Sequence, residues 1–432
     1  MNEAMGVFLL FLVPGLPLLL AFPALRSYLP RPCYFALLPA IILAAVPMTF
    51  SIDIPWLLLG SRFGINDMSR LLLAMSVLLW LVSAGLFYRS ADYSSEGCIS
   101  TCFMLALAGS LGVILAMDLI SFFVFLTLTG YGFYALLVSE GGEGTRQSGR
   151  IYLSFMIIAD LVLFEALLIA AAVTDNLAFE AVHHAIAQSS SLDLYLLMVI
   201  IAFMIKAGLW PLSFWLLPVF RSSRPVVAVL LGGVPVAAGL LGMVRWLPLG
   251  EISSPEPGMI IQYLGGAAVI YAVLAGLIRA QLKISAIYVA IMFTGFFFIA
   301  VGTGLTYPAV WQQYGYFIYF FIALFSIGFA VLVMLLRSLE SKYPDKMIPV
   351  KQSDSISLWF KQHWPVIIER LTAQMRFDGI SRLKTKMNFL WQKHLWERIL
   401  DRSESFLQRW NIAITLFLVL GLIMVFVRVL PF

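Results

Sequence analysis

The sequence predicts an all-α polytopic membrane protein, and both its composition and its hydropathy indicate this class. Of its 432 residues, 61% are hydrophobic and only 12% are charged, and the mean hydropathy is +0.95. Soluble domains carry roughly half apolar and a quarter charged residues, so this chain has too few polar groups for a water-soluble fold. Because one spanning helix takes about 20 residues, the length allows about 12 spans and no separate soluble catalytic domain.

Apolar runs separated by charged or Gly/Pro-rich breaks locate these spans. They predict helices near residues 5–25, 33–50, 68–88, 99–117, 119–138, 151–173, 194–218, 224–247, 259–280, 284–304, 315–336 and 411–430. The first run is expected to be a span and not a signal peptide, because no basic residue precedes it. Four segments follow from this pattern: N-terminal spans (1–60), a membrane core (61–336), a basic amphipathic segment (337–409) and a last anchor (410–432).

Basic residues predict the orientation. In the connections before residue 337, most of them fall in the odd-numbered ones: Arg26, Arg31, Arg89, Arg146, Arg150, Arg221, Arg224, Arg279 and Lys283. The even-numbered connections offer Arg62 and Arg245 among acidic residues, and His183 and His184 are expected on the surface of one of them. The positive-inside rule places the odd connections in the cytoplasm and both termini on the outer face of a bacterial-type inner (cell) membrane. We attribute the net charge of +5 to topology and expect no nucleic-acid partner.

The segment 337–409 has a different composition, rich in Lys, Arg, Trp and Phe. Trp359, Trp364, Trp391 and Trp396 recur with other apolar residues at helical spacing, against basic residues on the other face. This pattern predicts amphipathic helices on the cytoplasmic side. They either lie among lipid headgroups or bind neighbouring subunits, and the sequence leaves both readings open.

Lys206 is the main candidate for a functional side chain, because a charged group inside a span costs several kcal/mol. It lies about mid-span, and Gly208 and Pro211 follow it, where the missing proline N–H breaks the helical ladder. Such a lysine suits a proton relay, with a structurally paired or snorkelling lysine as the alternative. Asp160 and Glu165, five residues apart in one span, are both candidates for its counter-ion.

Other polar and flexible positions have more structural interpretations. Asp67 and Asp118 stand at the starts of spans, where a carboxylate is favoured by the helix dipole, so capping is expected. Gly232, Gly233, Pro235 and Gly239 within 224–247 predict a kinked or discontinuous helix beside an ion path. We find no pattern that would bind a metal or a cofactor.

The stretches around Lys206 resemble one family. Residues 206–218 (KAGLWPLSFWLLP), 224–228 (RPVVA), 64–70 (GINDMSR), 118–125 (DLISFFVF) and 280–288 (AQLKISAIY) are similar to the antiporter-like membrane subunits of respiratory complex I. Relatives of these subunits occur in Mrp-type antiporters, membrane-bound hydrogenases and inorganic-carbon uptake complexes. The resemblance covers about residues 60–335 and implies an antiporter-like core with broken helices, in which the lysine begins a proton path.

The resemblance also shows departures. The family's charged or histidine positions fall at Thr127, Ser213, near Ala237 and near Ser326, so only Lys206 of the usual charged chain is present. With Pro211 and Pro235, the residues Thr127, Ser213 and Ser326 would then line the path. The helices that usually complete the second half-channel are not expected here.

Three functions remain open at this point. The first is a proton- or cation-translocating subunit of a multisubunit complex, in which Lys206 and an acidic partner relay protons. The second is a structural subunit that seals the membrane and ties neighbours together, and the third is an autonomous secondary transporter. In the first case the chain would be at most a non-catalytic membrane subunit of an ion-translocating oxidoreductase, without a redox centre or cofactor of its own.

Overall fold

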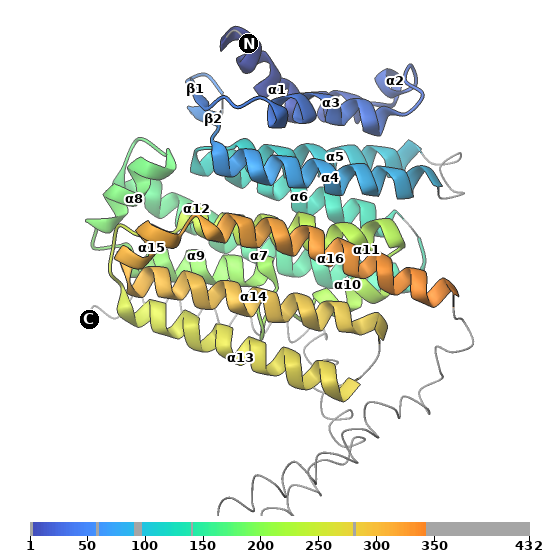
Figure 1. The fold of residues 1–432 in the computed structure, drawn as a ribbon. Helices are drawn as coiled ribbons and strands as arrows, with labels where there is room; N and C mark the ends of the chain where they lie inside the picture. Colours follow the sequence, from blue (N-terminus) through green and yellow to red (C-terminus); the bar gives the residue numbers. More distant parts are fainter. Residues whose placement is uncertain (1–2, 58–59, 90–96, 140, 280–281, 343–432) are drawn as a thin grey trace, which may run out of the picture. The chain divides into compact units, whose positions relative to one another are not determined.

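The computed structural model describes residues 3–57, 60–89, 97–139, 141–279 and 282–342, and most of these residues are helical (Figure 1). Within them, eight helices are long and apolar enough to cross a membrane, and two shorter apolar helices cover Met5–Leu20 and Pro32–Ala45. The predicted helical membrane class is therefore confirmed. The amphipathic segment beyond residue 342 and the span predicted at 411–430 lie outside the described residues.

The elements follow one another along the chain with short connections. They are α1 (Glu3–Leu20), α2 (Pro23–Arg26), α3 (Pro32–Ala45), β1 (Phe50–Ile54), β2 (Ser61–Ile65), α4 (Asp67–Arg89), α5 (Gly97–Leu115), α6 (Leu119–Val138), α7 (Glu143–Val173), α8 (Phe179–Ala187), α9 (Leu192–Ala207), α10 (Leu216–Ser222), α11 (Pro225–Leu231), a π-helical turn (Gly232–Val236), α12 (Ala237–Trp246), α13 (Pro255–Arg279), α14 (Leu282–Thr306), α15 (Pro308–Tyr314) and α16 (Phe317–Lys342). Prolines open α2, α3, α11, α13 and α15, where a missing N–H costs no helical hydrogen bond.

Several predicted helices are shorter or divided in the structure. The span expected at 5–25 ends at Leu20, and the one expected at 33–50 ends at Ala45. The span expected at 194–218 consists of α9 and α10, with an irregular turn between them. The discontinuous helix predicted at 224–247 is present, because α11 and α12 are joined through the π-helical turn that contains Pro235.

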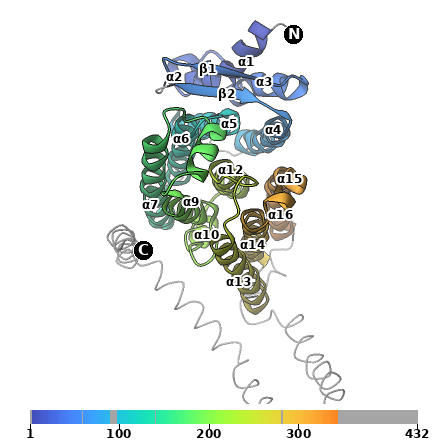
Figure 2. The same ribbon diagram turned by 90° about the vertical axis from the view of Figure 1, so that its left-hand side faces the viewer.

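The described chain divides into two compact units. Among the described residues, the first comprises those up to Val269 together with Ala290–Met334, and the second comprises those within Ile270–Val289 and from Leu335 to Lys342. In the first unit α5 packs along α6, and α9 packs along both α7 and α12 (Figure 2). In the second unit the rings of Tyr271 and Tyr288 lie 6.4 Å apart.

Small residues allow α5 and α6 to approach closely. A Cβ added at Gly109 would lie 2.5 Å from the Thr129 nitrogen, and one added at Gly132 would lie 2.7 Å from the Ala106 nitrogen. Membrane helices associate largely through such close backbone contacts, because the surrounding lipid is as apolar as their side chains. These two glycines therefore allow the close packing of α5 along α6.

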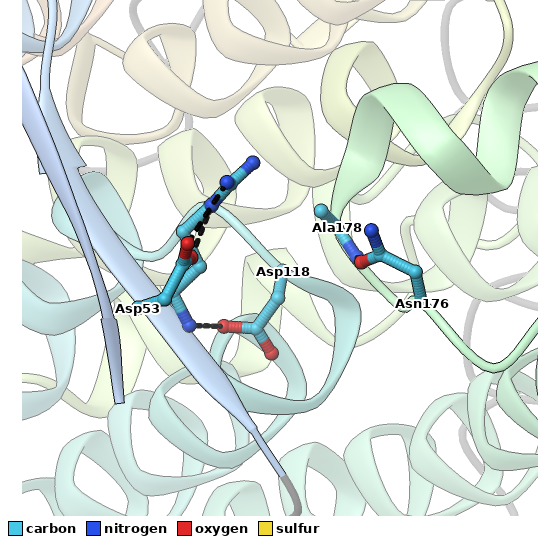
Figure 3. Close-up of polar contacts among 5 residues, drawn as sticks. Asp53, Asp118, Asn176 and Ala178 are labelled. Atoms are coloured by element: carbon cyan, nitrogen blue, oxygen red, sulfur yellow. Dashed lines mark hydrogen bonds and ion pairs between the residues drawn. The ribbon is translucent and has the colours of Figure 1, made fainter. Parts of the chain in front are cut away.

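A β-hairpin between α3 and α4 was not predicted from the sequence. Strands β1 and β2 pair antiparallel, with Ile52 opposite Phe63. Arg62 fixes the hairpin: its Nε lies 2.5 Å from Asp53 Oδ1, and this contact lowers the pKa of Asp53. The Arg62 backbone N–H donates to Asp118 Oδ2 at 2.7 Å (Figure 3).

Asp118 has the capping role that the sequence predicted. Its Oδ1 accepts a hydrogen bond from the Ser121 N–H at 2.7 Å and so satisfies one free donor of the first turn of α6. Beside it, the Asn176 side chain accepts from the Ala178 N–H at 3.0 Å and leads the chain into α8 (Figure 3). In place of the loop expected around His183 and His184, the structure has the short helix α8.

Candidate functional site

The site begins where α9 ends. Gly208 adopts a left-handed conformation (φ 66°, ψ 42°), which glycine reaches without a steric penalty. Its N–H bonds to the Ile205 carbonyl at 3.2 Å, and the Leu209 N–H bonds back to the Met204 carbonyl at 2.9 Å. This pair of hydrogen bonds is a Schellman-type helix end. It places Lys206 in the last turn of α9, next to the break that the sequence predicted.

Trp215 adds a second hydrogen bond to a carbonyl at the end of the broken helix. Pro211 lies in the turn after α9 and has no N–H to offer. The indole Nε1 of Trp215 donates to the Ile205 carbonyl at 2.9 Å, and this ring is fully buried. Its ring also packs on Tyr152 of α7, with centroids 5.2 Å apart. The turn is therefore held against both α9 and α7.

Lys206 forms a buried ion pair with Asp160 of α7. Lys206 Nζ lies 2.7 Å from Asp160 Oδ1, and the two side chains are only 3% and 10% exposed. Glu165, the other candidate counter-ion, is exposed on α7 and forms no ion pair among the described residues. Five helical residues correspond to about 500°, so the two acids point to different faces, and only Asp160 faces α9.

Gly239 of α12 determines how closely a second helix approaches Lys206. A Cβ at this position would lie 2.8 Å from the Ala207 nitrogen and 2.9 Å from the Lys206 carbonyl carbon. Both neighbours are backbone atoms, so they cannot move aside as a flexible side chain would. The glycine therefore allows α12 to pack directly against the turn that carries the lysine.

At the four positions where the family resemblance implies charged or histidine residues, this chain carries hydroxyl or apolar side chains. Thr127 donates to the Phe123 carbonyl at 2.8 Å, and Ser326 donates to the Ile322 carbonyl at 2.8 Å. Ser213 is buried in the turn after α9, and Ala237 begins α12 after the π-helical turn. A Cβ at Gly233, in that turn, would lie 3.5 Å from Ser326 Cβ. The structure thus brings Ser326 to the π-helical turn.

Comparisons with known proteins identify the family to which this chain belongs. The model of the NADH:quinone oxidoreductase/Mrp antiporter transmembrane family matches residues 116–353, more than half of the chain. This chain belongs to that family. The matched region contains α6 to α16, with both members of the buried ion pair.

Individual relatives agree with this assignment. The chain is 26% identical over 271 residues to NADH-quinone oxidoreductase subunit M of Escherichia coli (strain K12), which covers 58% of this chain and 52% of that protein. It is 30% identical over 175 residues to a probable K(+)/H(+) antiporter subunit of Rhizobium meliloti (strain 1021), covering 39% of this chain and 32% of that protein. The match therefore spans about half the length of the E. coli relative.

A solved structure shows the same fold. A chain of the Mrp complex from Dietzia sp. superposes with a TM-score of 0.66 at 17% identity, over 78% of this chain and 38% of that one. With the apolar helices, these matches establish a multi-pass membrane protein of the NADH:quinone oxidoreductase/Mrp antiporter family.

In this family member the sequence analysis missed a buried arginine. Arg245 was assigned to an outer connection, but it lies in α12 and is only 9% exposed. Its Nη1 donates to the carbonyls of Val113 and Ala116 at 2.9 and 2.6 Å, and its Nη2 donates to the Ile114 carbonyl and the Ser69 hydroxyl at 2.7 and 3.0 Å. The guanidinium thus satisfies the last carbonyls of α5 and cannot be counted as a loop charge.

The prediction that both histidines lie on the surface is wrong for His183. Its Nε2 lies 2.9 Å from the Arg245 carbonyl, its Nδ1 lies 3.8 Å from Glu251 Oε1, and its side chain is 14% exposed. Burial lowers the pKa of His183 to about 4. His184, one residue on, is exposed as expected.

Tyr131 is a second residue that the sequence analysis did not single out. It lies on α6, one helical turn after Thr127, and it interacts electrostatically with the Asp160 carboxylate. Its side chain is 38% exposed, whereas Asp160 is buried. Tyr131 is therefore a partly exposed neighbour of the buried pair. No sequence pattern marks it, because one tyrosine in an apolar helix is ordinary.

Proposed function

We propose that this chain is a proton-translocating membrane subunit of a multisubunit assembly and that Lys206 and Asp160 relay the proton. The single observation that carries the proposal is their buried ion pair at the end of a broken helix. Membership of a family whose members include subunits of quinone oxidoreductases and cation/proton antiporters supports it. We place the host assembly among complex I-like, Mrp-like, hydrogenase-like or inorganic-carbon uptake complexes.

The geometry allows proton exchange within the pair. Lys206 Nζ and Asp160 Oδ1 lie 2.7 Å apart as an ion pair, and Asp160 Oδ1 accepts no hydrogen bond from the described residues in this geometry. A rotation of the ammonium that aligns one N–H with the carboxylate would let a proton pass and leave two neutral groups. A change of charge or shape in a partner subunit would shift the balance between these two states. The Tyr131 hydroxyl can both donate and accept, and it would connect Asp160 with the next proton carrier.

The two alternatives explain the pair less well. A subunit that only sealed the membrane would need no buried ions, since replacing a buried ion pair with apolar residues is often neutral or stabilises a protein by about 1–4 kcal/mol. An autonomous transporter would need its own substrate site, whereas the relatives named above are subunits. The retained pair therefore favours a relay in a complex.

Orientation and contacts complete the proposal. We infer an inner (cell) membrane location with both termini outside, from the excess of arginine in the odd connections. Residues 337–409 would then lie on the cytoplasmic side and contact lipid headgroups or neighbouring membrane subunits. These inferences rest on charge distribution and composition.

The test uses membrane vesicles that contain the full chain in its native complex. Proton uptake is followed with a fluorescent pH-gradient dye for wild type, Asp160→Asn and the matched control Glu165→Gln. Both variants remove one carboxylate from α7, but only the first removes the partner of Lys206. We expect Asp160→Asn to lose most of the uptake and Glu165→Gln to keep it. Full uptake by Asp160→Asn in a normally assembled complex would refute the relay.

A further inference from the structure

A cavity of about 500 Å³ in the first unit lies between the start of α3, the last turns of α4 and Met334 of α16. Its lining has two parts: basic and phenolic residues (Arg31, Arg89, Tyr34 and Tyr88) and small or apolar ones (Val82, Gly85, Leu86 and Met334). This volume lies within the range of small-molecule sites, about 300–1,000 Å³. It lies apart from the Lys206–Asp160 pair, and none of its lining residues belongs to the relay.

The charge of this cavity is positive and not compensated by the described residues. Arg31 precedes the first residue of α3, and Arg89 is the last residue of α4. Both side chains are exposed, and neither forms an ion pair within the part of the chain that the structure describes. Two guanidinium groups at one opening are suited to an anion with several oxygen atoms, such as a phosphodiester.

The polarity of the cavity changes with depth. Val82, Gly85, Leu86 and Arg89 follow one another along one face of α4, at helical spacings of three and four residues. At 1.5 Å per residue, Val82 lies about 10 Å along the helix from Arg89, toward the middle of the span. Because Arg89 is the last residue of the apolar helix α4, we expect the basic end at headgroup level and the apolar end at acyl-chain level.

The aromatic residues give the cavity a fixed wall. The Tyr88 hydroxyl accepts a hydrogen bond from the Cys33 N–H at 2.9 Å, and its ring lies 5.4 Å from that of Tyr34. A Cβ at Gly85 would lie 3.6 Å from the Tyr34 hydroxyl. Glycine at this position therefore keeps the space beside Tyr34 open.

We propose that this cavity binds one anionic phospholipid, with its phosphate between Arg31 and Arg89 and the start of an acyl chain along Val82 and Leu86. The gradient from charge to apolar surface matches the polarity of a lipid in its normal orientation in the bilayer, and a free phosphate would leave the apolar part unused. Basic pockets between membrane helices suit such headgroups. The proposal does not depend on proton translocation.

The test measures lipid retention by native mass spectrometry of the purified full chain in its complex. Delipidated protein is titrated with phosphatidylglycerol, phosphatidylcholine or inorganic phosphate. The variants are Arg31→Gln/Arg89→Gln and, as a control, Arg146→Gln/Arg150→Gln, which removes two exposed arginines of α7. A third variant, Gly85→Leu, fills the cavity without changing its charge.

We expect wild type and the α7 control to retain phosphatidylglycerol in preference to phosphatidylcholine. The double variant at Arg31 and Arg89 should bind it about 25-fold more weakly, because each basic residue near the surface contributes about fivefold. Gly85→Leu should also lose it. Equal binding of both lipids, unchanged binding by the Arg31/Arg89 variant or by Gly85→Leu, or displacement by inorganic phosphate would each overturn the proposal.

Discussion

Replacing Gly239 with alanine should disturb the relay without touching its charged groups. The new Cβ would lie 2.8 Å from the Ala207 nitrogen, and ordinary contact begins at 3.4 Å, so α9 and α12 must separate by about 0.6 Å (3.4 minus 2.8). Overpacking of this kind costs about 1–3 kcal/mol, and alanine in a helix recovers about 1 kcal/mol relative to glycine. The net loss of stability should therefore be about 0–2 kcal/mol.

The effect on transport should be larger than this loss of stability suggests. A misplacement of about 1 Å in a reacting group can cost about a hundredfold in rate, so a shift at Lys206 should lower proton uptake about tenfold or more. Proton uptake and thermal unfolding are measured for Gly239→Ala and for the control Gly266→Ala in α13, where an added Cβ meets nothing within 4 Å. If Gly239→Ala transports protons like Gly266→Ala, the close contact of α12 does not position Lys206, and the reasoning is refuted.

Three further predictions concern the groups around the site. Trp215→Phe keeps an aromatic ring but removes one of the two donors to the Ile205 carbonyl, so thermal unfolding should show a loss of about 0.5–1.5 kcal/mol, and an unchanged melting temperature would contradict this. Arg245→Met leaves the last carbonyls of α5 without their donor and should cost about 3 kcal/mol or more in the same assay, whereas the exposed Arg146→Gln should cost nothing measurable. Burial lowers the pKa of His183 to about 4, below its usual 6.5, so as the pH falls the unfolded chain takes up a proton before the folded chain does. The free energy of unfolding should therefore be unaffected by this group above pH 6.5 and fall by up to about 3 kcal/mol between pH 6.5 and 4. His183→Gln should remove this part of the pH dependence, and an identical pH profile for the variant would show that another group causes it.

The sequence predicts the helical membrane core well, because long apolar runs admit few other structures. The span expected at 119–138 has those bounds in the structure, and the one expected at 68–88 is α4, Asp67–Arg89. The break after Lys206 was also predictable, since Gly208 and Pro211 act through the local backbone. In each case the deciding physical effect lies within a few residues of the chain.

The remaining features depend on contacts between distant segments. Asp160 and Glu165 are equivalent in sequence, and only the packing of α7 against α9 decides which of them pairs with Lys206. Arg245 stands at the end of an apolar run and has the sequence pattern of an interfacial charge. In the structure it is buried, because it donates hydrogen bonds to carbonyls at the end of α5. The hairpin at 50–65 was not predicted because its strands are short and one contact that holds it, from the Arg62 N–H to Asp118, joins residues 56 positions apart.

A double-mutant cycle on proton uptake tests the central claim most directly. Uptake is measured in vesicles of the native complex for wild type, Lys206→Met, Asp160→Asn and the double variant, each at matched assembly. Groups that act as one unit show strongly non-additive effects. We predict that each single variant loses about as much uptake as the double variant does, because neither group relays a proton without the other. Additive losses, or full uptake in the double variant, would contradict a relay through Lys206 and Asp160.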